Sequence, residues 1–174
     1  RADLLLGQIS VPDRVPRVSQ HFDHIAVKKS KREFVTHTGT LKGRPISVVS
    51  TGIGASNIDI VINECDALHN IDFQHHAVKK DIVSLRFLRL GTCGSLIESL
   101  EVDQLVLSSA AIGFDGFMSF YLQHYDAAMS SLLQTVKHHF RAMPAFNTAY
   151  VGQANQALSG LFEGYVNQGV TLTC

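Results

Sequence analysis

The 174-residue chain is predicted to be an α/β protein in which helices cover a largely parallel or mixed sheet. Three observations support this class. Apolar runs of strand length alternate with segments of helical periodicity. Glycine-rich turns follow two of the predicted strands. Hydrophobic residues make up 45% of the chain and charged residues 17%, which is typical of a globular core.

The first predicted elements are two strands at residues 34–41 and 45–50, joined by a turn signal at Lys42-Gly43-Arg44. The second strand ends in the glycine-rich sequence TGIGASN. Apolar residues then recur at helical spacing and predict an amphipathic helix, with Ser56 or Asn57 near its N-cap. The apolar positions are Ile58, Val61, Ile62, Cys65 and Leu68.

The second half of the chain continues this alternation. The polar segment 70–84 is predicted to be a loop, and the apolar run LRFLRL after it a buried strand. Further strands are predicted at 102–113 and 169–174, and helices at 126–140 and 153–164. Sites in such folds lie at the carboxyl ends of strands, which is where both glycine-rich turns fall.

Charge and composition exclude several classes of partner. Lysine plus arginine equals aspartate plus glutamate, at 15 each, so the chain lacks the basic excess expected of a nucleic-acid binder. The basic cluster 28–32 is interpreted as a solvated strand edge or loop. No apolar run reaches membrane-spanning length. The sequence shows no leader, and three widely spaced cysteines indicate reduced thiols, so a cytoplasmic location is expected.

Three familiar kinds of site do not fit the motifs. TGIGASN lacks the third small residue of a dinucleotide fingerprint, because Asn57 stands there, and Asp72 lies in the polar segment. The histidines show no zinc spacing, and the chain has neither CxxC nor HExxH. Cys93 has no histidine and acid in register, so it is interpreted as a pocket-lining residue and not a nucleophile.

The arginines indicate an anion site. Arg89 ends an apolar strand, where its charge needs either an internal carboxylate or an anion from outside. Arg14 follows a turn after an apolar segment, and Arg32 enters a predicted strand. The planar guanidinium group of arginine can donate two parallel hydrogen bonds to a phosphate, and glycines let backbone amides approach an oxyanion. With Gly91 and Thr92 beside Arg89, the sequence predicts a site for an anion the size of phosphate or sulfate.

Four stretches resemble the nucleoside phosphorylase family, and within it the uridine phosphorylases: PDRV at 12–15, KREFVTHTGTLKGRPISVVSTGIG at 31–54, LRLGTCGSL at 88–96 and GFDGF at 113–117. The resemblance implies a three-layer α/β/α fold with a central mixed, twisted sheet. It also implies a pentosyltransferase that converts uridine and inorganic phosphate into uracil and ribose 1-phosphate, with phosphate as co-substrate and no required cofactor. The alternatives are a purine nucleoside phosphorylase, or a non-catalytic truncated homologue that acts as a binding or assembly subunit.

The resemblance also implies roles for individual residues. Arg14, Arg89 and Thr92 match phosphate ligands, with Arg89 and Thr92 acting in catalysis. Arg32 matches an arginine that reaches into a neighbouring subunit's site, which implies a homodimer or a ring of dimers. Thr92, Cys93 and Gly94 match a nucleoside pocket, and a possible potassium site involves Glu33, Ile53 and Asn57.

The chain also departs from the family pattern. The first phosphate turn of the family is usually Gly-Asp-Pro-x-Arg, whereas residues 10–14 are SVPDR. The base-recognition loop and the Glu-Met-Glu motif have no counterpart, so base and sugar preference stay open. We therefore expect residues 1–174 to be a single phosphorylase-like domain without its C-terminal part. If the 174 residues are the entire molecule, weak phosphate binding without turnover of uridine is expected.

Overall fold

A computed structural model of the chain describes residues 4–173. The chain divides into two compact units, Arg1–Cys93 and Gly94–Cys174. Each unit combines a sheet with helices, which confirms the predicted α/β class. Among the helices of the described residues, none is long and apolar enough to cross a membrane.

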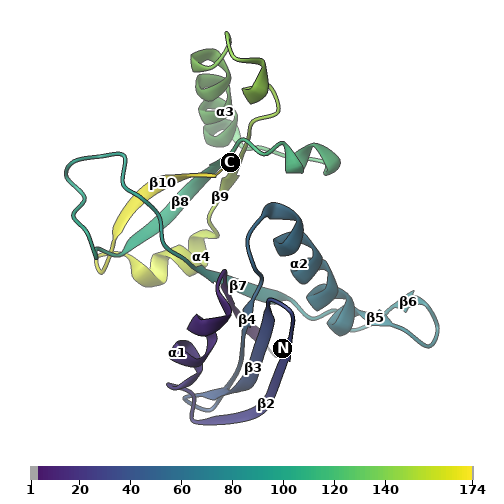
Figure 1. Ribbon diagram of the computed structural model, residues 1–174. Helices are drawn as coiled ribbons and strands as arrows, with labels where there is room; N and C mark the ends of the chain where they lie inside the picture. Colours follow the sequence, from purple (N-terminus) through teal and green to yellow (C-terminus); the bar gives the residue numbers. More distant parts are fainter. Residues whose placement is uncertain (1–3, 174) are drawn as a thin grey trace. The chain divides into compact units, whose positions relative to one another are not determined.

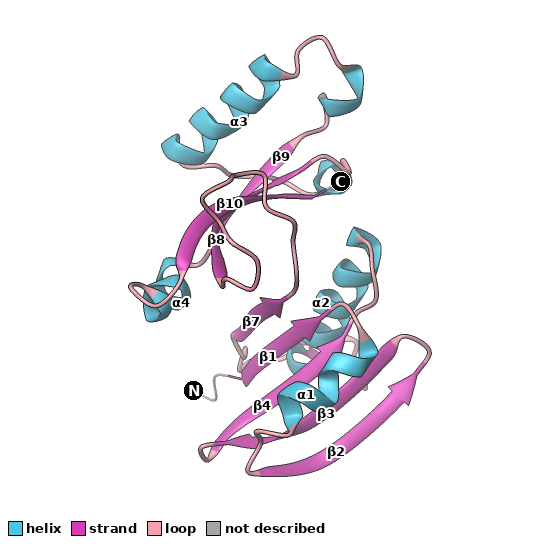
Figure 2. Cartoon of the chain, turned by 60° about the vertical axis from the view of Figure 1, so that its left-hand side comes forward, coloured by secondary structure: helices cyan, strands magenta, loops and turns pink. Residues whose placement is uncertain are grey.

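The first unit contains a five-stranded mixed sheet in the order β2-β3-β4-β1-β7 (Figure 2). β1 pairs in parallel with β4 on one side and with β7 on the other, whereas β2 and β3 run antiparallel to their neighbours. The mixed character of the sheet is therefore confirmed. The strands are β1 (Leu4–Ile9), β2 (His24–Lys31), β3 (Phe34–Leu41), β4 (Arg44–Ser50) and β7 (Leu85–Leu90).

The predicted hairpin at 34–50 is present with nearly the predicted boundaries. Lys42 and Gly43 join β3 to β4 with φ values of 51° and 72°, the left-handed pair that tight hairpins favour. The basic cluster 28–32 falls mainly on β2, whose exposed lysines lie on an edge strand of this sheet. Lysines at such an edge discourage pairing with another chain.

Helices lie on both sides of this sheet (Figure 1), so the first unit has three layers. A short 3-10 turn η1 (Pro12–Arg14) leads into α1 (Val15–Ser19), and α2 (Ala55–Asn70) lies on the opposite side. α2 confirms the predicted helix, and Ser56 and Asn57 lie in its first turn, near the N-cap as predicted. Gly54, with φ of 106°, occupies the cap position, and no side chain caps the helix.

The segment after α2 is more ordered than predicted. It contains a small hairpin of β5 (Ile71–Asp72) and β6 (Ala77–Val78). The buried side chain of Asn70 joins the two ends of this segment, because its Oδ1 accepts a hydrogen bond from the backbone N–H of Val83 at 2.7 Å. The loop prediction for 70–84 missed this pairing, which depends on contacts that no local pattern encodes.

β7 confirms the predicted strand, but the expectation that it is buried is wrong. Its residues are half-buried or exposed, none is buried, and Leu90 is 43% exposed. The reason is its position, because within the described residues β7 lies at an edge of the sheet and pairs with β1 alone.

The second unit contains a three-stranded sheet in the order β10-β8-β9, which includes the strands predicted at 102–113 and 169–174. β8 (Val106–Gly113) and β10 (Asn167–Thr173) are parallel, and β9 (Tyr150–Gln153) runs antiparallel to β8. The predicted helix at 126–140 is α3 (Ala127–His139), capped by Asp126, whose Oδ1 accepts from the N–H of Met129 at 2.8 Å. α3 packs through Leu133 and Val136.

The prediction of a helix at 153–164 is mostly wrong. β9 ends at Gln153, and α-helix covers only α4 (Gln156–Ser159) before the 3-10 turn η4 (Gly160–Phe162). Two glycines in this stretch weaken the helix, and Gly164 has a φ of 78°. The remaining short elements are the 3-10 turns η2 (Phe117–Phe120) and η3 (Pro144–Phe146).

The GFDGF motif forms a corner at the end of β8. Asp115 accepts hydrogen bonds from the hydroxyl of Tyr150 at 3.1 Å and from the N–H of Phe117 at 2.8 Å. Burial, followed by the charge of Asp115, raises the pKa of Tyr150 to about 12. Phe114 packs edge-on against Phe146, with ring centroids 4.6 Å apart. These contacts give the motif a structural role in the second unit.

Candidate functional site

Three parallel strands of the first unit end at the same level. Ile9 in β1 pairs with Ser50 in β4 and with Leu90 in β7. The backbone N–H of Thr51 donates to the carbonyl of Ile9 at 2.8 Å, which extends the pairing one residue past β4. The segments that follow these strands therefore leave from one edge of the sheet, where α/β folds place their sites.

The turn between β2 and β3 reaches the same edge, because β3 is antiparallel to β4. Lys31 pairs with Phe34, so Arg32 and Glu33 form a two-residue turn. Ser50 fixes this turn beside the end of β4. Its Oγ accepts from the N–H of Val35 at 2.8 Å and donates to the carbonyl of Glu33 at 2.5 Å.

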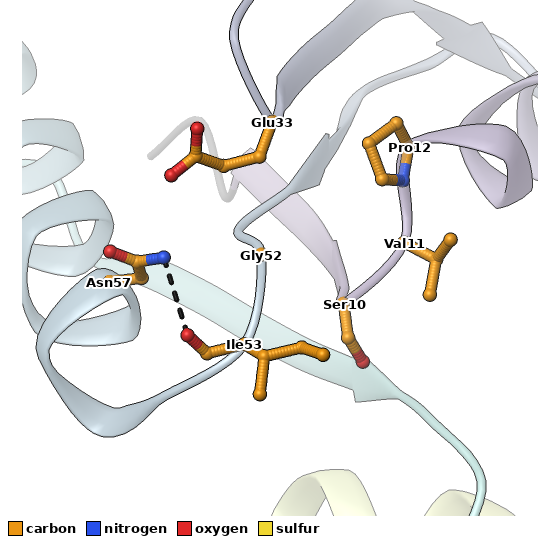
Figure 3. Close-up of a pocket in the computed structure, with 7 residues that line it drawn as sticks. All are labelled: Ser10, Val11, Pro12, Glu33, Gly52, Ile53 and Asn57. Carbon is orange, nitrogen blue, oxygen red and sulfur yellow. Dashed lines mark hydrogen bonds between the residues drawn. The ribbon is translucent and has the colours of Figure 1, made fainter.

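A shallow pocket of about 340 Å³ lies between these segments (Figure 3). Its walls come from the segment after β1, from the β2–β3 turn, from the turn after β4 and from the first helical turn of α2. The lining residues are Ser10, Val11, Pro12, Glu33, Gly52, Ile53 and Asn57.

The three residues of the predicted potassium site all line this pocket. The amide nitrogen of Asn57 donates to the carbonyl oxygen of Ile53 at 3.4 Å (Figure 3). Gly52, with φ of 71°, lies between Glu33 and Asn57. A Cβ on Gly52 would be 3.0 Å from Cγ of Glu33 and 2.9 Å from Nδ2 of Asn57. The Glu33 carboxylate and the Ile53 carbonyl are oxygen donors of the type that a hard cation prefers.

The described residues contain no group of three or more histidine, cysteine, aspartate and glutamate side chains that could hold a metal ion. The pocket therefore offers a cation one carboxylate and neutral oxygens, a donor set different from that of a zinc centre.

The three predicted phosphate arginines lie on segments that converge at this edge. Arg14 is half-buried at the end of η1, Arg32 is exposed in the β2–β3 turn, and Arg89 is exposed near the end of β7. The guanidinium of Arg89 lies over Gly91, since a Cβ there would be 3.4 Å from Nη1. None of the three lines the 340 Å³ pocket.

No ion pair or side-chain hydrogen bond to these three guanidinium groups is found within residues 4–173. Of the two explanations for the charge of Arg89, an internal carboxylate is therefore not seen in this part of the chain. A guanidinium group without an acidic partner is available to bind an oxyanion.

The predicted nucleoside residues are not enclosed in the described part of the chain. Thr92 and Cys93 are exposed at the end of the first unit, and neither lines the 340 Å³ pocket. Gly94 begins the second unit, and a Cβ there would meet nothing within 4 Å. The structure brings the three residues of the predicted potassium site together in one pocket. It places the segments that carry the three arginines at one edge of the sheet. The roles of Thr92, Cys93 and Gly94 stay predictions.

Sequence reasoning missed several residues that build this edge. Buried Gln8 donates through Nε2 to Oγ1 of Thr51 at 2.9 Å, which links the ends of β1 and β4. Ser10, Val11 and Pro12 form a wall of the pocket. The glycine-rich turn could have identified Gly52, but only the parallel pairing of β1 with β4 brings residues 10–12 beside it.

Comparison with known proteins shows to which family this chain is similar. The Phosphorylase superfamily matches residues 6–174. A uridine phosphorylase from Thermococcus kodakarensis is 30% identical over 165 residues, which are 88% of this chain and 54% of that protein. A DeoD-type purine nucleoside phosphorylase from Streptococcus suis is 35% identical over 101 residues, 58% of this chain and 37% of that protein.

A solved structure gives the same result. A nucleoside phosphorylase from Trypanosoma brucei that shows uridine phosphorylase activity superposes with a TM-score of 0.79 at 26% identity, over 97% of this chain and 61% of that one. The chain thus spans between about a third and three fifths of the length of these relatives. On the match to residues 6–174, the chain belongs to the phosphorylase superfamily.

Proposed function

We propose that this chain carries the phosphate-binding part of a nucleoside phosphorylase that cleaves uridine with inorganic phosphate. One observation carries the proposal: Arg14 and Arg89 lie on segments at the same edge of the sheet, where β1 and β7 end together, and neither guanidinium has an acidic partner among the described residues. The names of the T. kodakarensis and T. brucei relatives support uridine as the substrate.

The reaction suits such a site because it needs charge stabilisation and positioning more than a covalent catalyst. A phosphate oxygen attacks C1′ of the ribose and forms the new C–O bond. The bond between C1′ and the base nitrogen breaks, and its electron pair leaves with uracil, whose nitrogen takes up the proton that hydrogen phosphate gives up. Arg89 and the hydroxyl of Thr92 hold the phosphate while its negative charge faces the oxocarbenium-like sugar. The products are uracil and ribose 1-phosphate.

The proposed active unit is a homodimer, alone or within a ring of dimers, with Arg32 acting in the neighbouring subunit's site. Two features of Arg32 support this role. It lies in an exposed turn, and its φ of 56° is a conformation that arginine rarely adopts. The position of Glu33 and Ile53 in one pocket supports a bound potassium ion, held by the Glu33 carboxylate and the Ile53 carbonyl. A cytoplasmic location fits the free thiols of Cys65 and Cys93.

The test is an assay of uracil release from uridine with and without phosphate. Release that requires phosphate and yields ribose 1-phosphate is the expected result. Release without phosphate would identify a hydrolase, and the absence of any release would favour a non-catalytic homologue. Inosine belongs in the same assay because of the S. suis relative, and cleavage of inosine alone would assign the chain to purine nucleosides.

A further inference from the structure

The helix that follows Arg14 is too short to hold its own position. α1 has five residues, and Arg14 is its N-cap residue. Isolated helices shorter than roughly 12 residues are marginal in water, so the orientation of α1 must come from its contacts with the sheet. The direction in which Arg14 points is therefore set by whatever anchors α1.

The first anchor is apolar. Val15, next to Arg14, is fully buried in a cluster with Ile9 and Val48. Val35 of β3 packs against the same cluster. Contacts of this kind hold α1 on the sheet, but they are not directional and do not prevent a small rotation or slide of the helix.

The second anchor is polar and directional. Oγ of Ser19, the last residue of α1, lies 2.7 Å from Nδ1 of His37 in β3. Both residues are buried, with exposed fractions of 2% and 8%. His37 pairs across the sheet with Val48, so the hydrogen bond lies on the face that holds the apolar cluster. A buried hydrogen bond fixes the angle and position of the helix in a way that valine contacts do not.

We propose that Ser19 and His37 are positioning residues for Arg14, and that their hydrogen bond sets the geometry with which Arg14 meets phosphate. The inference rests on the proposed function, because it assumes that Arg14 binds phosphate. Ser19 lies five residues after Arg14, about one and a half helical turns, so rotation of α1 about its axis carries the arginine with it. A misplacement of roughly 1 Å can reduce the rate of a reaction about 100-fold.

The decisive measurement is the affinity of the full chain for inorganic phosphate, by calorimetry, in Ser19→Ala and in a matched control. Ser47→Ala is that control. Buried Ser47 shares a 2.8 Å hydrogen bond with Thr38, on the opposite face of the same sheet. Both variants lose one buried hydroxyl, but only Ser19 belongs to α1. We expect Ser19→Ala to weaken phosphate binding about tenfold and Ser47→Ala to leave it within about twofold.

A double-mutant cycle separates positioning from general loss of stability. If Ser19 acts through Arg14, Ser19→Ala adds no further loss of phosphate affinity in an Arg14→Ala background. His37→Asn, which keeps a polar atom near Nδ1, should bind phosphate better than His37→Leu. In turnover, the KM for phosphate should rise in Ser19→Ala while the KM for uridine stays unchanged.

The outcomes also distinguish this inference from the proposed function. If wild type binds phosphate and Arg14→Ala weakens it, but Ser19→Ala and Ser47→Ala behave alike, the positioning role is wrong and the function stands. Additive losses in the double-mutant cycle would overturn the positioning role in the same way. If wild type does not bind phosphate, or Arg14→Ala binds it normally, the assumption about Arg14 fails and the inference fails with it.

Discussion

The backbone N–H of Thr51 donates to the carbonyl oxygen of Ile9 at 2.8 Å, and this hydrogen bond aligns the ends of β1 and β4. The buried side chain of Gln8 reinforces the alignment through Oγ1 of Thr51. Residues 10–14 and 51–54 consequently start from the same level of the sheet, and the proposed phosphate site depends on that alignment.

Arg89→Ala should lower kcat/KM for phosphate by roughly 100-fold or more, because it removes a charged donor that holds and orients the attacking phosphate. The fold should be unaffected, since Arg89 is exposed on an edge strand. Steady-state kinetics at varied phosphate, with a thermal melt for each variant, measure both effects. Arg44→Ala is the control, because Arg44 is an exposed arginine at the start of β4, whereas β4 ends at the proposed site. Equal activity of the two variants would remove Arg89 from the site.

Mixing two inactive variants tests whether Arg32 acts across a dimer interface. In a heterodimer of Arg32→Ala and Arg89→Ala subunits, one site lacks both arginines and the other keeps both. Co-expression should therefore restore about a quarter of wild-type activity when subunits pair at random in two-fold symmetric dimers. Activity assays of the co-purified mixture, set against each parent variant, measure this. If the mixture is as inactive as its parents, Arg32 serves its own subunit.

Arg32→Gly should stabilise the first unit while it abolishes phosphate-dependent turnover. The φ of 56° at Arg32 is unfavourable for any residue with a Cβ, so glycine should increase the free energy of unfolding by up to about 1 kcal/mol. Urea unfolding and the uracil assay measure the two effects. Lys42→Gly, at a φ of 51° in the other hairpin turn, should give a similar gain without loss of activity. A destabilised Arg32→Gly protein would contradict the prediction.

Acid should destabilise the protein partly through His37. Burial, and then the nearby charge of Lys28, lowers the pKa of His37 below its ordinary value of 6.5. Below pH 6.5 the imidazole of His37 binds a proton in the unfolded chain, whereas in the folded chain it stays neutral until a lower pH. The contribution of His37 is therefore complete above pH 6.5 and is lost as the pH falls towards its folded-state pKa.

Urea unfolding at about pH 7.5 and about pH 5 measures this contribution. The loss of unfolding free energy between these conditions should be smaller in His37→Asn than in wild type. The exposed His24 of β2 provides the control, because His24→Asn should keep the wild-type loss. An unchanged loss in His37→Asn would show that other groups cause the acid sensitivity.

Local patterns were sufficient for much of the fold. The hairpin at 34–50, the helix after TGIGASN and the helix at 126–140 follow from periodicity and turn residues, and the structure confirms them. β1 had no such signal, because six residues with three consecutive leucines show neither alternation nor a turn. Its place between β4 and β7 depends on pairing with distant residues.

The candidate site was predicted residue by residue but not as an arrangement. The arginines could be identified because arginine beside glycine turns suits an anion, and their convergence required the register of four strands. The Ser19–His37 hydrogen bond gave no sequence signal, since a serine and a histidine 18 residues apart form no motif. Glu33 and Asn57 meet only because Gly52 leaves room between them.

The register of β1 also affects when the site can form. Ile9 pairs with Ser50 and Leu90, roughly 40 and 80 residues later in the chain, and such long-range contacts form late in folding. The edge that gathers the arginines does not exist in any partly folded chain that lacks β4 or β7. If phosphate binds there as proposed, it binds only the fully paired sheet, so phosphate should stabilise the folded chain by an amount that grows with its concentration.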